Sequence, residues 1–200
     1  MPVARRWFTG HEAWLVGAAL GYLVSSLAAS VLFRVELATP STVLAISVVV
    51  LALALRIMGA GRIETSELPW LAVTWLVVML IVVVPFWRIG ASVADGVAYR
   101  AYFSADLMTH LSVVAELQKG VFPLHDPFYA GGGLGYYWLF FTLPAALGVW
   151  LGNQTALLAT YVAGGLLFAG LLYAAARRFD LAPARAFLAA SVMMGAVSYE

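Results

Sequence analysis

Long hydrophobic runs separated by short polar segments are the main pattern along this chain. The first uncharged run covers residues 13–33, and its 21 residues are enough for a helix that crosses roughly 30 Å of hydrocarbon. Comparable runs at 39–56 and 68–87 follow after only short polar segments. The first run is therefore predicted to remain as a span rather than to be removed as a signal peptide.

The second half of the chain continues this pattern. Residues 127–176 contain no Asp, Glu, Lys, Arg or His, which predicts spans at 135–152 and 155–176 joined by a tight turn around Gly152. A sixth run at 186–200 stops short of the roughly 20 residues that a span needs. The sequence is therefore expected to be the N-terminal part of a longer chain.

The fold class follows from the demands of the bilayer. Backbone groups in lipid must be hydrogen-bonded within the protein, which leaves helices and closed barrels as the spanning structures. No apolar run shows the period-two alternation of a barrel strand. The prediction is an all-α, polytopic helical membrane protein: about five to six transmembrane helices in a single transmembrane domain over residues 1–200, plus an amphipathic surface helix in an extracytoplasmic loop.

Composition supports the membrane assignment and removes other classes. Hydrophobic residues make up 64% of the chain and charged residues 10%, against roughly 25% charged in a typical soluble domain. The net charge of +1 provides no basic face, so nucleic acid is excluded as a partner and the lipid bilayer is the expected one. The absence of cysteine excludes disulfides, thiolate metal sites and iron–sulfur clusters within these residues.

Basic residues between the runs predict the orientation. Four arginines flank the first three runs on one side: Arg5, Arg6, Arg56 and Arg62. By the positive-inside rule, we expect a multi-pass protein of the plasma (inner) membrane, with a cytoplasmic N-terminus and residues 88–134 outside. Counting six spans also places Arg177, Arg178 and Arg185 outside, which the rule disfavours.

The predicted outer loop holds most of the candidate chemistry. Residues 88–126 contain nine of the 24 ionisable side chains, so what matters is their arrangement. Residues 104–119 predict a surface helix with Ser104 as its N-cap, Asp106 in its first turn and Gly120 past its end. One arc of this helix is apolar and the opposite arc is polar. The apolar arc holds Leu107, Leu111 and Val114, and the polar arc holds Thr109, Ser112, Glu116 and Lys119.

Asp106 and His110 are four residues apart on this predicted helix, so their side chains face the same way. One interpretation is structural: a first-turn carboxylate favoured by the helix dipole, worth about 0.3–1 kcal/mol, with a histidine partner. The other is chemical: a general base or a pair of metal ligands. Metal binding needs further ligands, for which Asp95, His125 and Asp126 are the candidates within the loop.

The end of the loop is rich in glycine and aromatic residues. Gly131, Gly132, Gly133 and Gly135 fit neither a dinucleotide fingerprint nor a P-loop, because no strand precedes them and no Lys-Ser/Thr follows. Two roles remain open for Tyr136, Tyr137 and Trp138. They anchor a span at the membrane interface, or they stack on a sugar ring.

Taken together, the loop resembles the first luminal loop of the GT-C superfamily of polytopic membrane glycosyltransferases. The resemblance covers residues 101–151 and rests on these motifs: Asp106-x-x-x-His110, Gly120-x-x-Pro123, Asp126-Pro127, the glycine-rich stretch and Tyr136-Tyr137. It implies transfer of a sugar from a polyprenyl-phosphate-linked donor to an extracytoplasmic acceptor, which is a glycan, a lipid or a protein. Many members carry this loop after the first span, whereas three predicted spans precede it here.

The same resemblance implies roles for individual residues. Asp106 would be the base or the acceptor-orienting group, with His110 and Asp126 as further catalytic candidates. In some branches a divalent metal such as Mg²⁺ or Mn²⁺ takes part, and Asp106 and His110 would then be its ligands. Candidates for binding the donor phosphate or the substrate are Arg88, Arg100, Lys119, His125, Tyr136 and Tyr137.

Two other classes remain as alternatives. In a transporter or channel fragment, Asp106, His110 and Asp126 would line a substrate or proton path. A membrane anchor or assembly subunit would use none of them chemically. The position of these residues in a long loop, rather than in broken spans, favours the glycosyltransferase.

Overall fold

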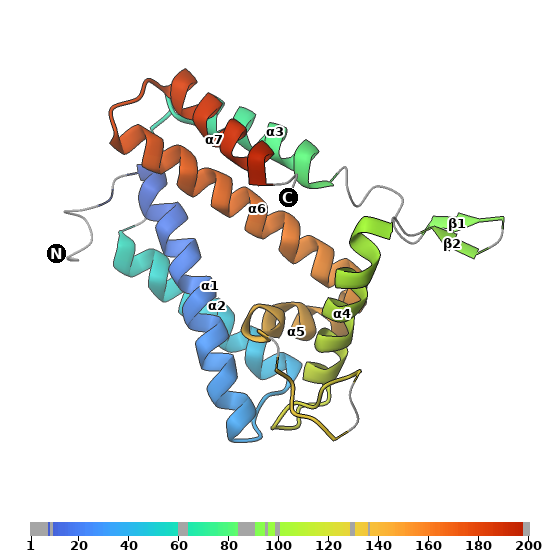
Figure 1. The fold of residues 1–200 in the computed structure, drawn as a ribbon. Coiled ribbons are helices and arrows are strands. Elements are labelled where there is room, and N and C mark those ends of the chain that lie inside the picture. The colour runs from blue at the N-terminus through green and yellow to red at the C-terminus, as the bar shows by residue number, and fades with distance from the viewer. Residues whose placement is uncertain are drawn as a thin grey trace. The chain divides into compact units, whose positions relative to one another are not determined.

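A computed structural model shows a chain built of helices (Figure 1). It describes the following residues: 8, 10–59, 64–83, 91–94, 96–98, 101–128, 131–135 and 137–197. The helices are α1 (Gly10–Arg34), α2 (Pro40–Met58), α3 (Leu68–Val83), α4 (Ala101–Gln118), α5 (Thr142–Leu151), α6 (Asn153–Arg178) and α7 (Pro183–Val197). The strands β1 (Ala91–Val93) and β2 (Gly96–Ala98) form a short antiparallel hairpin between α3 and α4. The helical fold class is confirmed, and the hairpin is an addition that the sequence pattern did not predict.

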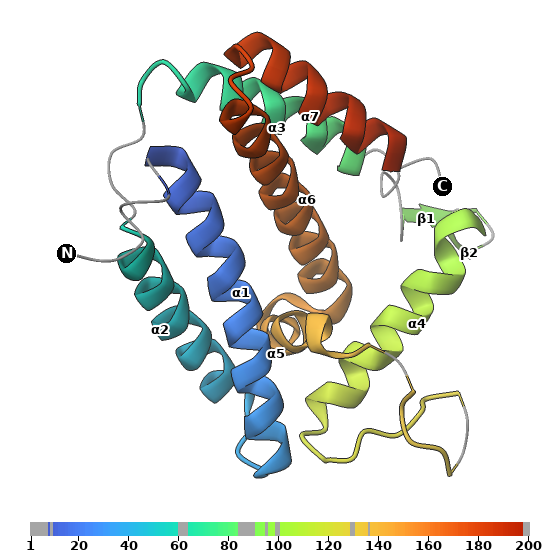
Figure 2. The same cartoon turned by 60° about the vertical axis from the view of Figure 1, so that its left-hand side comes forward.

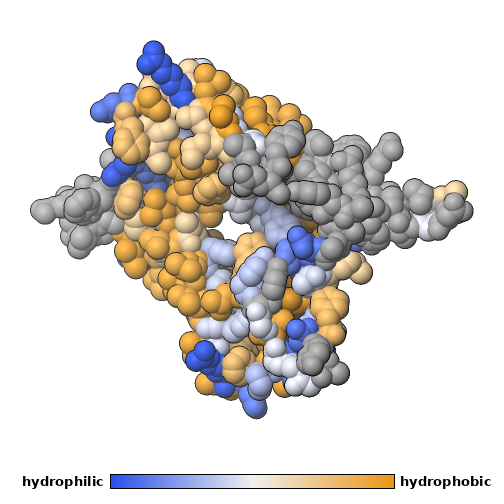
Figure 3. All heavy atoms as spheres, in the orientation of Figure 1, coloured by the Kyte–Doolittle hydropathy of each residue, from blue (hydrophilic) through white to orange (hydrophobic). Residues whose placement is uncertain are grey.

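Three helices among the described residues are long and apolar enough to cross a membrane. These are α1 with 25 residues, α2 with 19 and α6 with 26. Many of their apolar side chains lie on the surface, for example Leu23 and Val48, which are 54% and 66% exposed. Figure 3 shows hydrophobic residues over much of the described surface in that view. Such a surface fits a helical membrane protein, because lipid tails solvate apolar side chains that water would not.

The predicted span at 135–152 is not a continuous helix. A 3-10 turn at Leu139–Phe141 leads into α5, which has 10 residues and is about 15 Å long, half the hydrocarbon thickness. Residues 137–138, just before the 3-10 turn, are not helical. Trp138 packs against α1 instead, with its ring 6.0 Å from the ring of Phe33. The predicted turn is present but shorter, with Gly152 at φ 79° as the single non-helical residue between α5 and α6.

The chain forms two compact units, and three of the long helices contribute to both. The first unit comprises the described residues of 1–22, 51–85 and 161–200. The second comprises those of 23–50 and 86–160.

Helix directions in the first unit follow from pairs of touching residues. Leu55 and Leu51 of α2 lie against Gly17 and Gly21 of α1, so these helices are antiparallel; Figures 1 and 2 both show them side by side. The Trp75 indole of α3 donates to the Leu166 carbonyl of α6. Two apolar clusters then join α3, α6 and α7. Their buried members are Leu71, Tyr173, Ala176, Ala186 and Ala190 in one, and Val78, Ala169 and Met194 in the other.

Two ion pairs bring helix ends together in this unit. Arg177 Nη2, in the last turn of α6, lies 2.7 Å from Glu67 Oε1, just before α3. Tyr173 Oη donates to Glu67 Oε2 at 2.6 Å. The Arg177 guanidinium, which hydrogen-bonds to Glu67, is the main reason that the pKa of this buried carboxyl is lowered. Arg178 Nη2 lies 3.1 Å from Glu12 Oε2, in the first turn of α1.

These contacts group the arginines differently from the prediction. The N-terminal ends of α1, α3 and α7 lie with the C-terminal ends of α2 and α6. The same end of the unit therefore holds Arg56, Arg177, Arg178 and Arg185. The prediction counts residues 135–152 as a crossing and so places Arg177 and its neighbours on the opposite side of the membrane from Arg56. Helix α5 has only ten residues, so the structure does not support counting it as a crossing.

The close approach of α1 and α2 makes Gly21 sensitive to any added side chain. A Cβ at Gly21 would lie 2.8 Å from Leu51 Cδ1 and 3.0 Å from Leu51 Cα. We expect Gly21→Ala to lower the free energy of unfolding by about 1–3 kcal/mol, since overpacking forces the two backbones apart. Thermal unfolding of the purified protein in detergent measures this.

Gly164 in α6 is the matched control, because a Cβ there would meet nothing within 4 Å. Gly164→Ala should leave stability unchanged or raise it by up to about 1 kcal/mol, the helix-propensity difference between the two residues. Equal effects of both substitutions would contradict the packing of α1 on α2.

Candidate functional site

Helix α4 carries the candidate site and packs on α5 within the second unit. Its buried apolar side chains are Leu107, Val113, Val114 and Leu117. Two residues of the predicted apolar arc, Leu107 and Val114, are thus buried within the protein. The helix begins at Ala101 instead of Ser104, which places Asp106 in the second turn. The predicted N-cap is thus wrong, and the dipole explanation for Asp106 is weakened because this effect is confined to the first turn.

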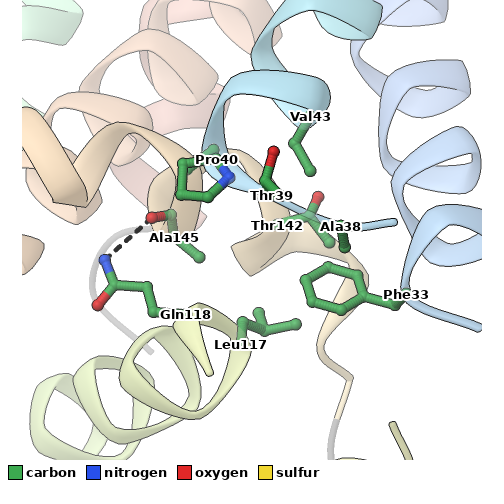
Figure 4. A pocket seen from close by; sticks show the side chains of 10 residues that line it. Phe33, Ala38, Thr39, Pro40, Val43, Leu117, Gln118, Thr142 and Ala145 are labelled. Carbon is green, nitrogen blue, oxygen red and sulfur yellow. Dashed lines mark hydrogen bonds between the residues drawn. The ribbon is translucent and has the colours of Figure 1, made fainter. Parts of the chain in front are cut away.

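The C-terminal end of α4 meets α5 and the α1–α2 turn around a small pocket that is partly open to solvent (Figure 4). Gln118 fixes this junction by donating from Nε2 to the Ala145 carbonyl at 3.0 Å and to Asn153 Oδ1 at 2.8 Å. Gly148 is in close contact with this junction, since a Cβ there would lie 2.5 Å from Asn153 Oδ1. Gln118 and Asn153 are not among the predicted site residues. The Gly148-x-x-x-Gly152 spacing indicates close helix packing at this point of the sequence.

Asp106 and His110 lie one turn apart on α4, with different surroundings. Asp106 is exposed, whereas His110 is half-buried. The His110 ring lies 4.9 Å from the ring of Phe141, which is fully buried. The Tyr137 hydroxyl lies 3.4 Å from His110 Nε2. The structure therefore brings together three of the predicted site residues, a carboxylate, an imidazole and a phenol, from α4 and from the segment before α5.

Burial lowers the pKa of His110, and the nearby negative charge of Asp106 raises it to a lesser extent. The net effect is a pKa below the ordinary value of 6.5. This lowering favours the neutral imidazole at pH 7, the form in which one ring nitrogen is a donor and the other an acceptor.

This electrostatic balance gives a direct test. In ¹⁵N-histidine NMR spectra, His110 should titrate below pH 6.5. Asp106→Asn should lower its pKa further, because the substitution removes the charge that favours the imidazolium. A rise, or no change, would show that the two side chains do not interact. His125 serves as the internal reference, since it is 63% exposed and pairs with a different carboxylate.

Glu116 forms a second cluster, in an environment that differs from the prediction. The helical period predicts Glu116 on the polar arc of the surface helix, yet it is 3% exposed. Lys119 Nζ donates to Glu116 Oε2, and the His125 backbone N–H donates to Oε1 at 3.2 Å. These partners, Lys119 first, hold the pKa of Glu116 below its usual value despite its burial. A buried carboxylate needs such donors, and period-based patterns do not reveal them.

The loop after α4 is therefore fastened to the helix by Glu116. It then forms a narrow ribbon in which Leu134 N–H donates to the Leu124 carbonyl and Asp126 N–H to the Gly132 carbonyl. Asp126 Oδ1 accepts the Phe128 N–H at 2.8 Å and so closes a turn of its own. Of the two aspartates predicted to act on substrate, Asp126 has this structural role and Asp106 has the exposed carboxylate.

Three predicted binding residues, Arg88, Arg100 and Tyr136, lie outside the described residues, as does the proposed metal-ligand candidate Asp95. Lys119 and His125 lie in the Glu116 cluster instead of beside Asp106. Within the described part of the chain, no three His, Asp or Glu side chains come close enough to hold a metal ion. Asp106 and His110 therefore have no third protein ligand among those residues.

Comparison with known proteins gives no family for this chain, since no family model, curated protein or solved structure matches it.

Proposed function

We propose that the chain is part of a membrane glycosyltransferase of the GT-C type, which moves a sugar from a polyprenyl-phosphate-linked donor to an extracytoplasmic acceptor. The observation that carries this proposal is the position of exposed Asp106 one helical turn from half-buried His110 on α4, with the Tyr137 hydroxyl 3.4 Å from His110 Nε2. The motif resemblance covers the same residues. Helix α4 would lie along the membrane surface, where a lipid-linked donor is within reach.

In the proposed reaction, an acceptor hydroxyl attacks the anomeric carbon of the donor sugar. The Asp106 carboxylate takes the proton from this hydroxyl as the new C–O bond forms. The bond between the anomeric carbon and the phosphate oxygen breaks, and the polyprenyl phosphate leaves with the electron pair. General-base assistance of this kind contributes about 10²–10⁴-fold to the rate. Neutral His110 would hold the acceptor hydroxyl by accepting or donating one hydrogen bond.

Binding of the departing phosphate needs cationic groups. Lys119 is a weaker candidate than the sequence suggested, because its ammonium group is already paired with Glu116. Arg88 and Arg100 remain predictions for this role, and so does participation of Mg²⁺ or Mn²⁺.

We propose a cytoplasmic N-terminus in the inner membrane, with five crossings made by α1, α2, α3, α6 and α7. The short α5 would enter the membrane without crossing it. This topology puts the end of the first unit that holds Arg56, Arg177, Arg178 and Arg185 in the cytoplasm, as the positive-inside rule requires. The loop after α4 packs at the other end of α1, where Arg34 stands over the Phe122 ring at 5.9 Å.

Asp106→Asn in the full-length protein tests the catalytic proposal, with transfer of sugar to cell-surface acceptors as the readout. Loss of transfer at an unchanged protein level supports it. Loss of solute uptake with intact glycans would instead identify a transporter. No effect on either would contradict the role of Asp106, as the anchor alternative predicts.

A further inference from the structure

We infer that Tyr137 is a stacking platform for a pyranose ring beside Asp106 and His110. This inference rests on the proposed glycosyl transfer and adds a binding residue and a ligand class to that site. The sequence left two roles open for the aromatic residues before α5, a membrane anchor and a sugar contact. The surroundings of Tyr137 favour the second.

The Tyr137 ring packs against two aromatic neighbours. It stacks on Phe141 with a centroid distance of 5.7 Å and an interplanar angle of 26°, and Phe141 is fully buried. The His110 ring meets it edge-on at 6.3 Å and 61°. Even so, Tyr137 remains 62% exposed. A rigid aromatic ring with most of its surface open is suited to bind the apolar face of a ligand ring, since little side-chain freedom is lost on binding.

The position of Tyr137 does not suit an interfacial anchor of a span. Anchoring tyrosines stand at the end of a membrane-crossing helix and extend toward the headgroups. Tyr137 instead precedes the 3-10 turn and the ten-residue α5, and its hydroxyl approaches His110 Nε2 at 3.4 Å. The phenol is thus directed to the helix that carries the proposed base.

The chemistry around the ring matches a sugar. A pyranose has a face of C–H groups that stacks on an aromatic ring and a rim of hydroxyls that hydrogen-bond to polar side chains. The polar groups on the neighbouring helix are the exposed carboxylate of Asp106 and the imidazole of His110, whose Nε2 lies 3.4 Å from the Tyr137 hydroxyl. A ring seated on Tyr137 would therefore present its hydroxyls to the residues proposed to activate or orient one of them.

Saturation-transfer NMR on the full-length protein in nanodiscs tests the inference, with methyl glucoside and methyl mannoside as the probes. Tyr137→Leu should weaken binding of at least one probe by about three- to tenfold, the range expected for one aromatic contact. Tyr137→Phe should keep the affinity, because the ring remains when the hydroxyl is lost. Thermal unfolding of each variant separates a loss of binding from a loss of folding.

Phe128→Leu is the matched control, since Phe128 is another aromatic residue of the same loop and is 66% exposed. It should leave probe binding unchanged. Equal affinity of the wild type and folded Tyr137→Leu, or an equal loss in Phe128→Leu, would overturn the inference. Competition by polyprenyl phosphate glucose would assign the platform to the donor sugar, and lack of competition would assign it to the acceptor.

Asp106→Asn separates this inference from the function on which it rests. If Asp106→Asn abolishes transfer while Tyr137→Leu leaves probe affinity unchanged, the platform is wrong and the enzyme assignment stands. If the platform binds sugar but Asp106→Asn transfers normally, the chain binds carbohydrate without the proposed base.

Discussion

Asp106→Asn should lower glycan transfer by about 10²–10⁴-fold, the contribution of a positioned general base. The amide has nearly the same shape as the carboxylate but cannot accept the hydroxyl proton. Because Asp106 is exposed on α4, its replacement should change neither the amount of protein nor its melting temperature. Incorporation of labelled sugar into cell-surface glycans, in cells that carry only the variant, measures the effect.

Substitutions of two other aspartates serve as controls for this result. Asp126→Asn should have a much smaller effect, because the amide oxygen can still accept the Phe128 N–H that closes the turn. Asp180→Asn changes an exposed aspartate just after α6, at φ 58°, a conformation that asparagine tolerates. It should be silent. Normal transfer in Asp106→Asn would show that Asp106 is not the base, and a larger loss in Asp126→Asn would move the base to the loop.

Single-cysteine labelling should give an all-or-none pattern that fixes the topology. The chain has no cysteine, so each substitution adds one reporter for a membrane-impermeant thiol reagent applied to intact cells. Gly133→Cys, at an exposed position in the loop after α4, should be labelled. Ala182→Cys, exposed between α6 and α7, should not be labelled, because Arg177 and Arg178 hold that end beside Glu67 and Glu12.

Permeabilised cells provide the control, since both cysteines should then react. Gly61→Cys, which follows α2 in the sequence, should behave like Ala182→Cys. Labelling of both Gly133→Cys and Ala182→Cys in intact cells would show that α5 crosses the bilayer after all. Protection of Gly133→Cys alone would place the Asp106 loop inside and exclude an extracytoplasmic transferase.

The long helices were predictable because their signal is local. Runs of about 20 apolar residues correspond to α1, α2 and α6 within a few residues at each end. The run at 135–152 has the same composition, yet only Thr142–Leu151 forms an α-helix. Contacts of Tyr137 with His110 and of Trp138 with Phe33 hold the first part of that run outside the helix. A window of hydropathy contains no information about partners 27 or more residues away.

The candidate site was predictable only in part for the same reason. The spacing of Asp106 and His110 is a helical signal, and the structure brings these two together with Tyr137. The helical period predicts Glu116 on the polar arc. Its partners Lys119 and His125 lie after the end of α4, so the period cannot reveal them. The pairing of Arg177 with Glu67 joins residues 110 positions apart. This pairing places Arg177 at the same end of the first unit as Arg56. The predicted span count places these arginines on opposite sides of the membrane, against the positive-inside rule.

The separation between Glu67 and Arg177 also matters while the protein is being made. At about 5–20 residues per second, the ribosome reaches Arg177 roughly 5–20 s after it has added Glu67. The Glu67 carboxylate therefore lacks its Arg177 partner for that time, and the Glu12 carboxylate lacks Arg178 for longer. Both acids belong to the end proposed to stay in the cytoplasm, where water hydrates them until α6 arrives. In the proposed topology, insertion of α3 therefore does not require moving an unpaired charge through hydrocarbon.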